Sequence, residues 1–168
     1  MEGVVTKVTS RINFFDGRLI TAHDLRTEQD YFRTRMRRVN RHVHGFGIAT
    51  GLSVKLDPSR NDILIEPGFG ITPSGEEIEV CQQVVFKLPV VANTKATLIQ
   101  LRYVERPVEP LPAVERESAA FAVIEETSDV FVAEVHGPDA LTLARLVHAR
   151  GQWKLDSKFR RRSLRRGR

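Results

Sequence analysis

The sequence predicts an α+β fold: a mainly antiparallel β domain with one long N-terminal α-helix and a basic C-terminal tail. Apolar residues recur with a helical period over residues 21–44, and the period falls to about two from residue 47 onwards. The last eleven residues hold seven cations and no acid. We therefore expect a single helix-plus-β domain over residues 1–157 and an arginine-rich C-terminal extension over residues 158–168.

The helix has clear start and stop signals. Thr21 followed three residues later by Asp24 matches a capping box, and Gly45 is a good left-handed C-terminal cap. Between them runs one stripe of apolar side chains that is expected to pack against the β domain: Leu25, Phe32, Met36, Val39 and Val43. Arginines lie mainly off this stripe, and three of them are expected to contact a partner: Arg33, Arg37 and Arg41.

The chain beyond the helix is expected to form strands. GIATGLSVKLD and DILIEPG flank a turn and predict a hairpin, and a PSG turn precedes an alternating strand that buries Ile78 and Val80. ATLIQLRYVE, SAAFAVIEE and DVFVAEV predict three more strands, and the prolines of RPVEPLPAVERE indicate an extended connector after the first of them. LTLARLVHARGQWKLD fits a helix or a strand pair, and a hairpin turning at Arg150 and Gly151 is favoured.

The composition is that of an ordinary globular chain. Its 168 residues are enough for a substantial core, and 41% hydrophobic with 28% charged residues argues against disorder. The net charge is +5, and removing the seven cations of the extension leaves −2 for residues 1–157. The single cysteine, Cys81, excludes an internal disulfide and follows an alternating run that favours a half-buried strand position.

Export and membrane insertion are not indicated. The start, MEGVVTKVTSRINFF, lacks the continuous apolar block of a secretory signal, and no stretch approaches the roughly 18 apolar residues of a membrane-spanning helix. We expect a cytoplasmic protein with no membrane insertion.

Candidates for catalysis or ligand binding are weak. His42 and His44 are two residues apart, so on a helix they point in different directions and do not share a metal ion. Asp16, His23 and Asp24 lack a nucleophile in a recognisable elbow. GFGIATG and GFGITPSG have neither the spacing nor the lysine of a nucleotide-binding loop. We expect no catalytic residue, no cofactor and no bound metal.

The C-terminal extension accounts for the positive net charge of the chain through seven cations: Lys158, Arg160, Arg161, Arg162, Arg165, Arg166 and Arg168. Such a cluster docks into an acidic groove on a protein partner, neutralises the phosphates of RNA or DNA, or remains solvated. Only Phe159 is nearby for base stacking, which weighs against single-stranded nucleic acid. A protein partner is preferred, and nucleic acid is the alternative.

One long block resembles a known module. NFFDGRLITAHDLRTEQDYFRTRMRRVNRHVHGFGIATGLSV is similar to a module of baseplate- or tail-fibre-associated proteins in phage-tail-like contractile injection systems. The matching positions are Phe15, Asp16, Gly17, Leu19, Thr21, Asp24, Glu28, Gln29, Tyr31, Asn40, Arg41, His44, Gly45, Gly47, Gly51, Leu52 and Val54. ILIEPGFGITPSGEEIEV resembles the β-turn-β segment of that module, and LTLARLVHARGQWKLDSKFRR resembles its strand pair and arginine ending.

This resemblance implies a structural, non-enzymatic subunit of a phage-tail-like contractile injection particle. The implied role is that of a baseplate- or fibre-associated adaptor acting through protein–protein contacts. The partners it implies are other particle proteins, of the baseplate, spike, tube or fibre, and a homo-oligomer is compatible with it.

Overall fold

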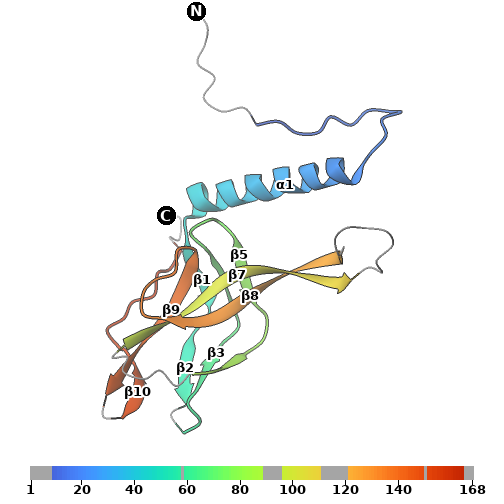
Figure 1. Ribbon diagram of the computed structural model, residues 1–168. Coiled ribbons are helices and arrows are strands. Elements are labelled where there is room, and N and C mark those ends of the chain that lie inside the picture. Colours follow the sequence, from blue (N-terminus) through green and yellow to red (C-terminus); the bar gives the residue numbers. More distant parts are fainter. Residues whose placement is uncertain (1–8, 58, 89–95, 111–120, 150, 165–168) are drawn as a thin grey trace, which may run out of the picture.

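Figure 1 shows a β body with a long helix lying outside it. The computed structural model describes residues 9–57, 59–88, 96–110, 121–149 and 151–164. In these residues the helix α1 (Ala22–Val39) continues into a π-helical turn, η1 (Asn40–His44). Ten strands follow: β1 (Gly47–Gly51), β2 (Val54–Asp57), β3 (Asp62–Ile65), β4 (Gly68–Ile71), β5 (Glu77–Val80), β6 (Val84–Lys87), β7 (Ala96–Pro110), β8 (Phe121–Ala133), β9 (Ala140–Ala149) and β10 (Gln152–Leu155).

The strands form three sheets, with the orders β1-β4-β5, β2-β3-β6 and β10-β9-β7-β8. Every pair of named strands is antiparallel. The predicted fold class, a mainly antiparallel β domain with an N-terminal helix, is therefore confirmed. No helix in the part of the chain that the structure describes has the length and apolar character needed to span a membrane.

Short-range signals in the sequence correctly predicted the local structure. The capping box is formed, because the Thr21 hydroxyl accepts from the backbone N–H of Asp24 while the Asp24 carboxylate accepts from the N–H of Thr21. The hairpin of β2 with β3 and that of β9 with β10 both form as expected, with Gly151 in the left-handed turn of the second. Ile78 and Val80 are buried on β5, as predicted from the alternation.

One hydrophobic core joins the three sheets. Its fully buried large apolar side chains are Leu52, Ile63, Ile65, Ile78, Ile99, Leu101, Leu143 and Leu146. The amide of Gln100 is buried as well, and it binds the loop between β8 and β9 by donating to Val135 O and accepting from the N–H of Gly137. None of the core residues belongs to α1, so the body's apolar packing does not depend on the helix.

The predicted proline-rich connector is instead part of a long arm. Pro107 and Pro110 lie within β7 and pair with β8, while β9 pairs with β7 only as far as Arg102. Beyond that point β7 has one neighbouring strand, so a residue without a backbone N–H is tolerated on its free side. The two strands predicted from SAAFAVIEE and DVFVAEV are the single strand β8, and residues 111–120 lie outside the described residues.

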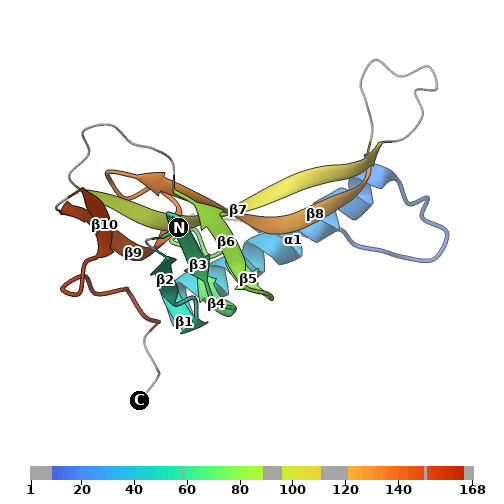
Figure 2. The ribbon, with the colours of Figure 1, turned by 90° about the horizontal axis from the view of Figure 1, so that it is seen from below.

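Figure 2 shows α1 running alongside the arm formed by β7 and β8.

The prediction for Cys81 was wrong, because this residue is exposed and follows the end of β5. The alternation that suggested a strand ends one residue before it.

Candidate protein-binding surfaces

The C-terminal end of α1 is fixed to the body by polar contacts. The Asn40 side chain is buried, and its amide donates to Gly75 O and to Glu77 Oε1, both at 3.0 Å. Gly75 has a φ of +96°, and a Cβ on it would lie 2.3 Å from the carbonyl oxygen of Arg37. The backbone of the β4–β5 turn therefore approaches the helix as closely as only glycine allows.

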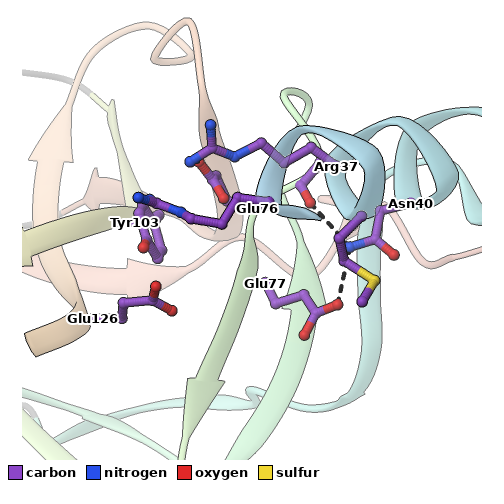
Figure 3. Close-up of a pocket in the computed structure, with 9 residues that line it drawn as sticks. Arg37, Asn40, Glu76, Glu77, Tyr103 and Glu126 are labelled. Carbon is purple, nitrogen blue, oxygen red and sulfur yellow. Dashed lines mark hydrogen bonds and ion pairs between the residues drawn. The ribbon is translucent and has the colours of Figure 1, made fainter. Parts of the chain in front are cut away.

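A small charged cleft of about 120 Å³ lies at this junction (Figure 3). Two helix arginines form ion pairs there, Arg37 with Glu76 and Arg33 with Glu105 on the arm. Tyr103 donates to Glu105 at 3.1 Å, and its burial, together with the charge of Glu126, raises the pKa of its hydroxyl. The cleft is lined by Arg33, Met36, Arg37, Asn40, Gly75, Glu76, Glu77, Tyr103 and Glu126.

These ion pairs link the helix to the arm and to the β4–β5 turn. No serine or cysteine is among the residues that line the cleft. In the described residues, no three histidine, cysteine, aspartate or glutamate side chains gather in a way that would hold a metal ion. The ion pair of Arg37 with Glu76 and the hydrogen bonds of Asn40 join α1 and η1 to the body at this cleft.

The apolar stripe of α1 is not covered by the β domain, and the prediction that it packs there was wrong. Its exposed fractions are 55% for Leu25, 58% for Phe32, 57% for Met36, 41% for Val39 and 70% for Val43. Periodicity identifies which face of a helix is apolar, but it does not specify the molecule that covers that face. Here the body holds the helix by its polar end, and the apolar face remains uncovered.

The three helix arginines proposed as partner contacts have different surroundings. Arg33 and Arg37 are engaged in the ion pairs of the cleft. Arg41 is exposed on η1 and has neither an ion pair nor a hydrogen bond through its side chain to any described residue. Of the three, Arg41 is the one whose charge stays available to another molecule.

The first half of the basic extension lies against the body. The N–H of Ile48 donates to Arg162 O at 2.8 Å, and the N–H of Leu164 donates to Ile48 O at 2.9 Å, so this segment adds to the edge of β1 in a parallel direction. Arg161 donates to Leu52 O at 2.7 Å. This docking was not predicted, because the only apolar signals in the segment are Phe159 and Leu164.

The cations of the extension are therefore not equivalent. Arg160 donates to Ser157 O, Arg162 donates to Phe46 O, and the side chain of Lys158 has no hydrogen bond or ion pair to a described residue. Arg165, Arg166 and Arg168 lie outside the described residues. The side chains of Arg161 and Arg162 already donate hydrogen bonds to carbonyl groups of this chain.

The arrangement of sheets, arm and helix resembles that of solved baseplate proteins from the type VI secretion system. It is similar to a chain of the TssK–TssF–TssG baseplate subcomplex of the type VI secretion system, with 16% identity and a TM-score of 0.59 over 90% of this chain and 61% of that one. A chain of the type VI baseplate complex matches with 16% identity and a TM-score of 0.58, over 92% of this chain and 42% of that one.

A crystal structure of TssK also matches, with 15% identity and a TM-score of 0.54 over 88% of this chain and 40% of that one. No protein-family model and no curated protein matches the sequence. The chain thus spans roughly two fifths to three fifths of the length of the structures it resembles. At these identities, the likeness defines the fold.

Proposed function

We propose that this chain is a structural, non-enzymatic subunit of a contractile injection particle, where it serves as a baseplate- or fibre-associated adaptor. The fold it shares with type VI baseplate proteins supports this role. The observation that carries the proposal is the uncovered apolar stripe of α1, defined by Leu25, Phe32, Met36, Val39 and Val43. A stripe of this extent is the part of the molecule best suited to bury against another subunit.

The energy available from the stripe is large enough for assembly. Full burial of a large apolar side chain contributes about 1.5–3 kcal/mol, and these five side chains are already partly covered. Burying what remains exposed is worth on the order of 5 kcal/mol before the entropic cost of association. The 18 residues of α1 span about 27 Å, a length that suits a helix lying in a groove.

The charges beside the stripe define the matching surface on the partner. Four exposed arginines of this helical region have no carboxylate partner among the described residues: Arg26, Arg35, Arg38 and Arg41. A groove with an apolar floor and an acidic rim would bury the stripe and neutralise these cations. The expected partner is therefore another particle protein that carries such a groove.

Phe32→Glu is the variant that tests this function. A tagged chain is expressed from its own locus, contractile particles are isolated by sedimentation, and their composition is measured by mass spectrometry. The intact chain is expected in the particles, and Phe32→Glu is expected to be lost from them. Val85→Glu is the matched control, because Val85 is 61% exposed on β6 against 58% for Phe32, and it lies away from the helix.

Retention of Phe32→Glu at the level of the control would refute the role of the stripe. Particles of unchanged composition and injection activity in a strain that lacks the gene would refute the proposed function as a whole.

A further inference from the structure

A second surface feature, which shares no lining residue with the cleft at the helix joint, has the properties of a binding site. A groove of about 540 Å³ is lined by residues of four segments: the start of β1, the β4–β5 turn, the β8–β9 loop with β9, and the docked segment after β10. Sites for ligands in proteins have volumes of about 300–1,000 Å³, so this groove is large enough to receive side chains of another molecule.

Most of the groove wall is apolar. Its large apolar residues are Phe46, Ile48, Pro73, Pro138, Leu141 and Phe159, and the side chains of His136 and Thr142 also line it. Leu141 and Ile48 are members of the core, so the floor is held by the packing of the body itself. A preformed apolar floor of this kind accepts a large aliphatic or aromatic side chain without reorganisation.

All the charge on the groove lining is positive. Arg160 and Arg162 stand at its exposed rim, and no aspartate or glutamate lines it. The nearest acid in the β8–β9 loop, Asp139, is engaged elsewhere, because its carboxylate accepts from the N–H and the hydroxyl of Ser74 at 2.8 and 2.7 Å. Asp156, which precedes the rim arginines, pairs with Arg145.

Arg162 is held in a fixed orientation. Its guanidinium carbon lies 3.5 Å from the centre of the Phe46 ring, and its Nε donates to Phe46 O at 3.1 Å. The two terminal nitrogens have no partner among the described residues. A guanidinium that is stacked and anchored in this way loses little entropy when it binds a carboxylate through those nitrogens.

We propose that this groove binds a short segment of a partner protein in which a large apolar side chain is flanked by carboxylates. The apolar side chain fills the floor, and the flanking carboxylates pair with Arg160 and Arg162. Nucleic acid is a poorer fit, because Arg162 covers one face of Phe46 and leaves Phe159 as the other phenylalanine of the groove on which a base could stack. The groove is separate from the stripe of α1, so this inference does not depend on the proposed place in a particle.

The test uses the full chain and labelled peptides. Fluorescence anisotropy is measured with fluorescein-labelled EEELFEEE, and with EEESGEEE, KKKLFKKK and single-stranded DNA as comparison probes. EEELFEEE is expected to bind at least about tenfold more tightly than EEESGEEE, because only the first fills the apolar floor, and KKKLFKKK is expected not to bind.

A charge-reversal variant locates the site. Arg160→Glu is expected to weaken EEELFEEE binding by about tenfold or more, since it places like charges together. Lys154→Glu is the matched control with the same change in net charge, because Lys154 is exposed on β10 outside the groove, and it is expected to leave the affinity unchanged. Thermal unfolding of both variants verifies that they are folded.

Three results with the peptides and variants would overturn the inference. They are the absence of EEELFEEE binding, equal affinities for the two acidic peptides, and equal losses in the two variants. Displacement of EEELFEEE by single-stranded DNA at lower concentration than by unlabelled peptide would also overturn it, and would assign the cations to nucleic acid instead.

Discussion

Substituting Gly75 by alanine is expected to release α1 from the body while leaving the β core folded. Gly75 has a φ of +96°, and its missing Cβ would lie 2.3 Å from the carbonyl oxygen of Arg37. A side chain at this position costs about 1–3 kcal/mol in backbone strain. The overlap also forces the helix away, which removes the buried hydrogen bond from Asn40 to Gly75 O and costs about 1–3 kcal/mol more.

The combined cost, about 2–6 kcal/mol, falls on the helix joint because α1 contributes nothing to the core. Hydrogen exchange measured by mass spectrometry is expected to show faster exchange in α1 and unchanged protection of Leu98–Leu101 in the central strand β7. Local opening of this kind is expected wherever an element is joined by few buried contacts.

Gly151→Ala is the control for backbone strain alone. Gly151 also has a positive φ, +77°, but no atom lies within 4 Å of the position its Cβ would take. This variant is expected to destabilise the β9–β10 turn and to leave the exchange of α1 unchanged. Equal exchange of α1 in the two variants, or normal protection of α1 in Gly75→Ala, would refute the close approach as the origin of the joint.

Three further predictions concern stability. Phe32→Ser is expected to change the free energy of unfolding of the purified chain by less than about 0.5 kcal/mol, because the side chain is exposed, and a larger loss in chemical denaturation would mean that the stripe is covered. Gln100→Leu is expected to cost about 1–3 kcal/mol in the same assay, since it leaves the half-buried backbone N–H of Gly137 without its acceptor, and an unchanged midpoint would contradict this. Hydrogen bonds from Thr21 hold the pKa of the Asp24 carboxyl below its ordinary value. The stability that the ionised carboxylate contributes is therefore present above the pKa of the unfolded chain and is lost as the pH falls through the folded pKa. NMR titration is expected to show a higher pKa for Asp24 in Thr21→Val, and an unshifted pKa would exclude the cap as the cause.

Features determined within a few residues were predictable from the sequence. The start of α1 follows from the side chains of Thr21 and Asp24, and Gly45, whose φ is +77°, ends the π-helical turn η1 that continues the helix. The hairpins follow in the same way from turn residues between alternating segments. In each case the two groups that interact are close along the chain, so their spacing alone specifies the contact.

Features determined by distant parts of the chain were not predictable. The prolines of β7 predicted a connector, whereas they lie in a strand. A strand accepts them only beyond Arg102, where the pairing with β9 ends, and no residue near Pro107 in the sequence indicates where that pairing ends. The docking of residues 162–164 on β1 likewise depends on an open strand edge more than a hundred residues earlier. Gly47 is required at this contact, because a Cβ on it would lie 2.7 Å from Arg162 O. Nothing in the sequence distinguishes Gly47 from the neighbouring glycines.

The uncovered stripe follows from how the helix is attached. Asn40, Gly75 and the pair of Arg37 with Glu76 fix one end of α1 by polar contacts, and these contacts place the apolar face away from the core. A helix attached through apolar packing would have buried the same stripe and left nothing for a partner. Because the polar joint sets the helix direction and leaves its apolar surface exposed, the chain presents a preoriented apolar face, and the proposed partner would not have to order the helix before covering it.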